Sequence, residues 1–235
     1  MIVLGIDCAT NGCGAALWRE GVVLSARHEP MDRGQAESLI PMIVSVMNGV
    51  GVGFAEIDRV AVTVGPGSFT GVRVGLAAAR AIGLAADKPV LGITTTEAVA
   101  HAVPEFVRRG ALLLTVIESR RSEPYHQLFS DDLRPLTQPS SAPLESLADL
   151  LGSGTVLVAG DGVHLLPALE AVRWRFISDR GPDAGVVAAI AAGLAQENWM
   201  PADPLYVRPP DLTASATPGD FTPHPSPTPC QFSRD

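Results

Sequence analysis

The segment GPGSFTGVRVG, which begins at Gly65, combines residue types of a loop that could bind an anion. A Gly-Pro-Gly turn between a strand and a helix exposes backbone N–H groups at the helix N-terminus, where a partial positive charge favours an anion. Arg73, one turn into the helix, could add a charged donor. The candidate anion contacts are Gly65, Gly67, Ser68, Thr70 and Arg73. The segment lacks the ending of a P-loop and the spacing of a dinucleotide motif, so an anion cradle and a plain strand-to-helix crossover both remain open.

Two aspartates near predicted strand ends could take part in chemistry. Asp7 ends the first apolar run, in GIDCATNG, with Thr10 beside the turn; its carboxylate could hold a metal-bound water or cap a hairpin. Asp161, in AGDGV, could act as a general base, although an Asp-Gly turn explains it more simply. The five histidines include no HxxxH or HExxH pair, and there is no GxSxG elbow. We therefore predict no catalytic residue and no metal site on this chain.

The composition is that of a folded, acidic chain. Its 235 residues are 46% hydrophobic and carry a formal net charge of -8, which provides no general basic field for nucleic acid. Arg73 and Arg80 interrupt the most apolar stretch, so no membrane span is expected. The N-terminus MIVLGIDCAT lacks the basic start of a signal peptide, and the three cysteines form no CxxC pair. We expect a cytoplasmic protein with reduced thiols.

The N-terminal part of the chain alternates between strand and helix patterns. Strands are predicted over residues 2–7, 13–19, 22–27, 58–64 and 90–93, with Asn-Gly and Glu-Gly turns that favour hairpins between the first three. Helical spacing predicts one helix from Gln35 to about Asn48, with Pro41 in its first turn or at a kink. A second helix follows the glycine-rich loop and ends at Ala86.

A similar order recurs in weaker form in the rest of the chain. Strands are predicted over residues 111–117, 125–130 and 155–159, and helices over 144–151, 163–172 and 183–199. The repeated order predicts an α/β protein of two related lobes, residues 1–103 and 104–211, of which the second is smaller and less regular. Residues 212–235 are rich in Pro, Thr and Ser, so we expect a flexible or extended tail.

The second predicted helix carries a stripe of small residues. Gly71, Gly75, Ala79 and Gly83 recur at i, i+4 spacing, and apolar residues cover most of the remaining circumference. A helix that is apolar nearly all round is normally covered on two sides. One side is expected to be the chain's own sheet, and the other is either a second protein or a further helix of the same chain.

Four segments resemble the TsaB family, formerly called YeaZ: GIDCAT, GPGSFTGVRVGLAAARAIGLAADKPVLGI, ESRRSEPY and YVRPPD. The resemblance covers about residues 1–211. It implies an actin-like ATPase (ASKHA) fold of two ribonuclease-H-like lobes. It also implies a non-catalytic subunit of the complex that forms N6-threonylcarbamoyladenosine at position 37 of tRNAs reading codons that begin with A.

The resemblance also implies partners and their cofactors. The chain is expected to scaffold the catalytic paralogue TsaD, to act with the ATPase TsaE, and to meet tRNA only through the complex. In the paralogue, a metal is held by two histidines four residues apart after a segment like KPVLGI; the corresponding positions here are Thr95 and Val99, neither of which is a good metal ligand. ATP and metal are therefore expected in the partner subunits, with no cofactor held tightly by this chain.

The family pairs through the two helices predicted near residues 35–47 and 70–86, which are also candidates for a homodimer. The implied interface residues are Leu39, Ile43, Val46, Met47, Gly71, Val74, Gly75, Ala78, Ala79 and Ile82. Asp7, Thr10 and the glycine-rich loop would be vestigial phosphate or nucleotide contacts. Four residues of the family motifs have no assigned role: Arg120, Glu123, Tyr125 and Arg208.

Two other functions remain as alternatives. A stand-alone actin-like ATPase or kinase would need an ATP cleft with a base and Mg²⁺. A glycoprotease-like metallopeptidase, an old label attached to relatives, would need a metal or a nucleophile site.

Overall fold

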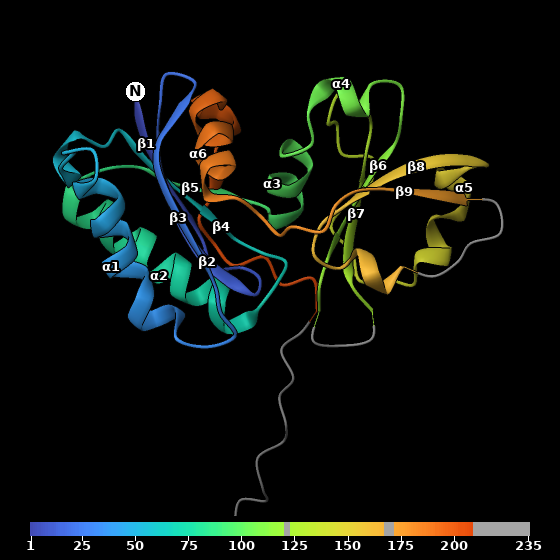
Figure 1. Ribbon diagram of the computed structural model, residues 1–235, viewed down its shortest axis with the longest axis horizontal. Helices are drawn as coiled ribbons and strands as arrows, with labels where there is room; N and C mark the ends of the chain where they lie inside the picture. The colour runs from blue at the N-terminus through green and yellow to red at the C-terminus, as the bar shows by residue number, and fades with distance from the viewer. Residues whose placement is uncertain (120–122, 167–171, 209–235) are drawn as a thin grey trace, which may run out of the picture.

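The computed structural model of the chain describes residues 1–119, 123–166 and 172–208. The predicted tail and Arg120 lie outside these residues. The described chain forms two α/β lobes, each built on one mixed sheet (Figure 1). The first sheet has the strand order β10-β5-β4-β1-β2-β3, and the second has the order β7-β6-β8-β9.

The first sheet begins with the predicted meander. It contains β1 (Ile2–Asp7), β2 (Gly12–Arg19), β3 (Val22–Pro30), β4 (Arg59–Thr63), β5 (Val90–Ile93) and β10 (Met200–Pro201). Glu20 and Gly21 both adopt positive φ angles, of 51° and 89°, which confirms the predicted two-residue hairpin between β2 and β3. β1, β4 and β5 pair in parallel, and their buried apolar runs form the centre of the sheet.

Helices cover both faces of this sheet. α1 (Gln35–Asn48) and α2 (Phe69–Ala86) pack on one face, and α6 (Ala184–Gly193) packs on the other (Figure 1). Pro41 lies in the second turn of α1, not in the first turn, which was one of the two predicted possibilities, and the helix continues through it. Leu39, Met42 and Ile43 are buried on either side of the proline, so packing on the sheet holds the helix together despite the missing N–H.

The second lobe is smaller and has shorter helices. Its strands are β6 (Leu113–Ile117), β7 (Tyr125–Phe129), β8 (Gly154–Ala159) and β9 (Val172–Ser178), with a 3₁₀ turn over Leu144–Leu147 followed by α5 (Ala148–Leu151). The helix predicted over 163–172 is wrong where the structure describes it, because Val163–Leu165 is a 3₁₀ turn and β9 begins at Val172. α3 (Thr95–His101) lies between the lobes, followed by α4 (Glu105–Arg108) (Figure 1).

The C-terminal part of the described chain returns to the first lobe. α6 packs against β1 so closely that a Cβ at Gly5 would lie 2.0 Å from the carbonyl oxygen of Ala184, and β10 pairs with β5. The boundaries expected for the second lobe, residues 104–211, thus do not match the packing of residues 184–205, which lie on the first lobe. The predicted helix over 183–199 ends at Gly193 and is followed by a 3₁₀ turn, Gln196–Asn198. The chain returns to the first lobe because α6 provides the apolar cover that the second face of the first sheet requires.

α2 also meets the length and composition of a membrane-spanning helix. Its 18 residues have a mean hydropathy of 1.3. In the described chain this helix packs on β4 and β1 through Gly71, Gly75 and Leu76, with Arg73 and Arg80 on its exposed side. That packing is the arrangement of a core helix.

Candidate functional site

The glycine-rich loop before α2 is filled by the chain's own backbone. The amide of Ser68 donates a 2.6 Å hydrogen bond to the carbonyl oxygen of Ala9, and a Cβ at Gly67 would lie 2.0 Å from the same oxygen. A Cβ at Gly71 would likewise lie 2.0 Å from the carbonyl oxygen of Cys8. These glycines let the β1–β2 loop approach α2, and they leave no open cradle. The Ser68 amide is therefore occupied by the chain's own backbone and is not free to bind an anion.

The remaining loop residues have other partners or lie on the surface. Ser68 is the N-cap of α2, since its hydroxyl accepts a hydrogen bond from the amide of Gly71. Gly65 has a φ of 105°, and a Cβ there would lie 2.8 Å from the carbonyl oxygen of Leu205. Thr70 is exposed, and Arg73 is held by aromatic side chains described below. Of the two interpretations of the loop, the strand-to-helix crossover is the one that the structure supports.

Asp7 is a buried carboxyl group at the end of β1. Its Oδ1 accepts hydrogen bonds from the Thr63 hydroxyl at 2.6 Å and the Ala9 amide at 3.0 Å, whereas Oδ2 is buried without a hydrogen-bond partner. Burial raises the pKa of Asp7 to about 6; the two hydrogen bonds partly offset this effect, and the nearby charges of Asp161 and Asp183 add to it. The bond to Ala9 shows the capping role that the sequence offered as one alternative.

Asp161 caps the start of the loop that follows β6. Its Oδ1 accepts a 2.8 Å hydrogen bond from the amide of Glu118, Thr10 bonds to its side chain, and burial raises its pKa. Asn11 donates to Glu118 at 3.0 Å, which joins the β1–β2 loop to the second lobe. Within the ranges that the structure describes, no three His, Cys, Asp or Glu residues are close enough to hold a metal ion together.

The positions that correspond to the paralogue's histidines are inside the protein. Thr95 is fully buried on α3, and its hydroxyl has no hydrogen-bond partner. Val99, one turn later, is 2% exposed and packs in an apolar cluster with Val103, Leu113 and Ile117. A metal would find neither a ligand nor an opening at this place.

Most of the expected interface residues are buried in the first lobe's own core, which corrects that assignment. Gly75 faces Val62, and a Cβ at Gly83 would lie 2.2 Å from a methyl group of Val90, so the small-residue stripe lets α2 approach its own sheet. Val74 and Ala78 are half-buried. The buried members are Leu39, Ile43, Val46, Met47, Gly71, Gly75, Ala79 and Ile82.

A different set of apolar residues lies on the solvent side of the same two helices. We call it the exposed helix face: Ile40 and Val44 on α1, and Ala77, Ala81 and Leu84 on α2. Leu84 is 87% exposed and Ile40 is 46% exposed. The helices run beside each other on one side of the sheet (Figure 1). An exposed apolar surface of this kind is typical of a protein interface. The sequence could have predicted it, because these residues are the apolar positions of the two helices that remain once the residues facing the sheet are set aside.

An aromatic cluster adjoins this face at the N-terminal end of α2. The Arg73 guanidinium lies 3.5 Å from the Phe69 ring centroid and donates a 2.9 Å hydrogen bond to the Tyr206 hydroxyl. The two rings are 5.3 Å apart, and both are 40% exposed. Sequence patterns do not predict this cluster, because Tyr206 is distant from α2 along the chain.

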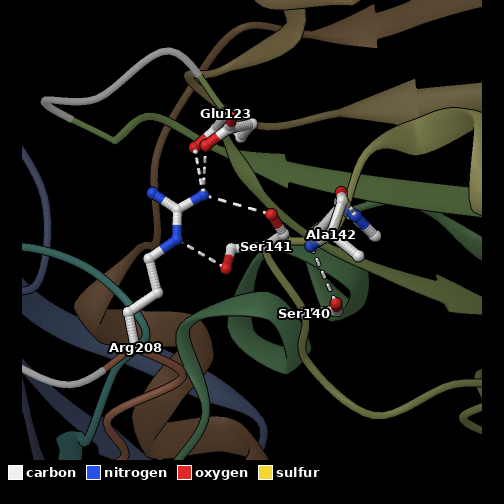
Figure 2. Close-up of polar contacts among 6 residues, drawn as sticks. Glu123, Ser140, Ser141, Ala142 and Arg208 are labelled. Atoms are coloured by element: carbon white, nitrogen blue, oxygen red, sulfur yellow. Dashed lines mark hydrogen bonds and ion pairs between the residues drawn. The ribbon is translucent and has the colours of Figure 1, made fainter.

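Two of the family motifs, ESRRSEPY and YVRPPD, meet in the structure through residues of unassigned role. Arg208 points toward Glu123 and Ser141 and bonds to both (Figure 2). Its guanidinium also lies 5.6 Å from the ring centroid of Tyr125. Three of the four unassigned family residues are therefore one cluster, and the fourth, Arg120, lies outside the described residues.

Known structures and relatives agree with this architecture. The solved YeaZ of Pseudomonas aeruginosa superimposes with a TM-score of 0.70 at 26% identity, over 87% of this chain and 99% of that one. A second Pseudomonas aeruginosa structure, of an uncharacterized protein with similarity to peptidase YeaZ, gives a TM-score of 0.73 at 25% identity, over 88% and 99%. The fold is that of the actin-like ATPases, built of two ribonuclease-H-like lobes.

Sequence comparison gives the family. Residues 29–138 match the family model described as TsaD, tRNA N6-adenosine threonylcarbamoyltransferase. The Escherichia coli protein named tRNA threonylcarbamoyladenosine biosynthesis protein TsaB is 28% identical over 80% of this chain and 78% of its own length. The uncharacterized Mycobacterium tuberculosis protein Rv3421c is 32% identical over 89% and 92%. The chain belongs to the TsaB (YeaZ) family.

Proposed function

We propose that this chain acts in the formation of N6-threonylcarbamoyladenosine at position 37 of tRNA, as a subunit that has no transfer site of its own and that scaffolds a TsaD-like paralogue. Family membership supports the pathway, because relatives from three bacteria are named as threonylcarbamoyladenosine biosynthesis proteins. The observation that carries the non-catalytic role is the burial of Thr95 and Val99 in the core. We place this function in the cytoplasm.

The chemistry of the reaction explains why those two residues matter. Transfer of a carbamoyl group requires a site that polarises its carbonyl, which a bound metal supplies when histidines hold it. A threonine hydroxyl and a valine methyl do not bind a transition metal, and both positions are closed by neighbouring side chains. These residues do not fit the metal, so the transfer step belongs to the partner, together with its metal and ATP.

The exposed helix face is the surface we assign to the paralogue. Ile40, Val44 and Leu84 provide apolar area, and Ala77 and Ala81 are small enough for a partner helix to approach closely. A second copy of this chain could use the same face when the paralogue is absent. The TsaE-like ATPase completes the assembly, and tRNA is reached through the complex, because a net charge of -8 provides no general field for RNA.

The two alternative functions have no residues placed for them in the described chain. A kinase or ATPase site would need an open phosphate loop and an accessible carboxylate, whereas Ala9 fills the loop and Asp7 is 1% exposed. A peptidase would need a set of metal ligands or an activated nucleophile. Isothermal titration with Mg-ATP tests the first alternative, since tight binding that Asp7→Ala abolishes would support it.

The partner test uses the paralogue encoded in the same genome. Wild-type chain is expected to co-purify with it, and Leu84→Asp is expected to weaken binding by about 30-fold or more, as at an interface hot spot. Phe106→Asp, the same kind of change at another exposed residue on α4, is the control. Threonylcarbamoyl transfer should require the paralogue and should not occur with this chain and the ATPase alone.

Failure of the wild-type chain to bind the paralogue or to support transfer would overturn the proposed function. If Leu84→Asp bound the paralogue with wild-type affinity, the assignment of the exposed helix face as the binding surface would be overturned.

A further inference from the structure

The cluster around Arg208 is unused by the proposed function, yet it joins the two lobes. Nη2 of Arg208 bonds to a Glu123 carboxylate oxygen at 2.9 Å and to the Ser141 carbonyl at 3.1 Å, and Nε bonds to the Ser141 hydroxyl at 2.6 Å (Figure 2). The Arg208 side chain is only 14% exposed. Glu123 and Ser141 both belong to the second lobe, beside β7.

The segment that carries Arg208 is otherwise held by the first lobe. We call residues 200–208 the strap. It begins as β10, paired with β5, and the Leu205 amide donates a 2.8 Å hydrogen bond to the carbonyl of Val64. Arg80 of α2 donates a 3.0 Å hydrogen bond to the carbonyl of Ala202 and forms an ion pair with Asp203. The strap therefore lies along the first lobe and then ends in the second.

Tyr206 lies between these two attachments. Its hydroxyl accepts the hydrogen bond from Arg73, and its ring packs on Phe69 at the N-terminal end of α2. Only Val207 separates Tyr206 from Arg208. Loss of the Arg208 attachment would free the backbone on one side of the tyrosine, and ordering it again would cost conformational entropy.

The geometry of the cluster requires arginine. One planar guanidinium serves the carboxylate, the carbonyl and the hydroxyl with Nη2 and Nε, and its carbon lies over the Tyr125 ring. A lysine ammonium could keep the charge near Glu123 but could not reproduce the fork of donors. Nη1 is buried without a hydrogen-bond partner, which is a cost that the other contacts must offset.

We infer that Arg208 is a positioning residue, which fastens the strap to the second lobe and thereby holds Tyr206 against the end of α2 beside the surface proposed for the paralogue. The fastening itself rests on the contacts of Arg208. Its effect on partner binding rests on the proposed function.

Hydrogen–deuterium exchange of the full chain tests the fastening. Arg208→Ala is expected to raise exchange at the Leu205 amide by about tenfold, because the strap opens locally, and to leave the amides of β1 unchanged. Arg208→Lys should give an intermediate increase, and it keeps the test usable if the alanine variant folds poorly. Arg109→Ala, which breaks an exposed ion pair with Glu105, is the matched control. Unchanged exchange in both Arg208 variants would overturn the inference.

Titration with the paralogue tests the consequence for the partner surface. Arg208→Ala and Tyr206→Ala are each expected to weaken binding by about five- to tenfold, and the double variant should lose little more, because both act through the same tyrosine. Wild-type affinity in Arg208→Ala would overturn the effect on the partner. If the wild-type chain fails to bind the paralogue, the proposed function fails, while the exchange experiment still decides the role of Arg208.

Discussion

A Cβ atom at Gly71 would lie 2.0 Å from the carbonyl oxygen of Cys8. The first turn of α2 and the end of β1 therefore pack backbone against backbone. This contact explains why the loop that resembles an anion cradle is filled by protein, and it makes Gly71 a test of the whole arrangement.

Gly71→Ala is expected to lower the free energy of unfolding by about 2–4 kcal/mol, because the methyl group would force the helix away from the strand. Denaturant unfolding measures the change. Gly193→Ala, at the end of α6, is the control, because no atom lies within 4 Å of its Cβ position; its effect should stay within about 1 kcal/mol. An unfolding midpoint like that of wild type in Gly71→Ala would contradict the close contact.

Asp7 should make stability depend on pH. Its pKa in the folded chain, about 6, lies above the value of 3.8 expected when unfolded. The folded state then binds the proton more tightly, so stability falls as pH rises from about 4 to about 6 and is lowered by about 3 kcal/mol above that range.

Asp7→Asn cannot ionise, and its amide oxygen can keep the bonds from Thr63 and Ala9. Relative to wild type, the variant should therefore gain about 2 kcal/mol of stability between about pH 4.5 and about pH 7.5. Asp87→Asn makes the same change on the surface and is the control. A wild-type-to-variant difference that stays constant over this range would show that Asp7 does not carry the buried charge.

Two adjacent threonines on α3 should respond in opposite directions to valine. The Thr95 hydroxyl is buried without a hydrogen-bond partner, so Thr95→Val is expected to raise the free energy of unfolding by about 1 kcal/mol. The Thr96 hydroxyl donates a 2.5 Å hydrogen bond to the side-chain oxygen of Gln127, and Thr96→Val should cost about 1–3 kcal/mol. Equal losses in both variants would mean that Thr95 has a polar partner after all.

The isolated chain is expected to self-associate through the exposed helix face, because an apolar surface without its partner remains in water. Analytical ultracentrifugation over a range of concentrations should show a dimer in wild type and a monomer in Leu84→Asp. Phe106→Asp should remain dimeric, since Phe106 is 80% exposed on α4, outside this face. A dimer that persists in Leu84→Asp would place self-association elsewhere.

Local patterns predicted most of the strands and the two long helices. The Glu20-Gly21 turn, α1 and α2 follow from short-range rules of turn chemistry and helical spacing, which act between residues close in the chain. β9 was missed although VRWRFIS shows the alternation of a half-buried strand. The helical stripe around Gly75 indicated a close approach, but spacing alone cannot say whether sheet or partner makes it.

The sequence by itself determined the family, the order of most of the main elements and the presence of a glycine-rich loop before α2. Only the tertiary structure decided that the Ala9 carbonyl meets this loop, that the glycine stripe faces the chain's own sheet, and that Arg208 meets Glu123, 85 residues away. The physical reason is that helix and turn preferences depend on near neighbours, whereas burial and hydrogen-bond partners depend on segments that are brought together only when the chain folds.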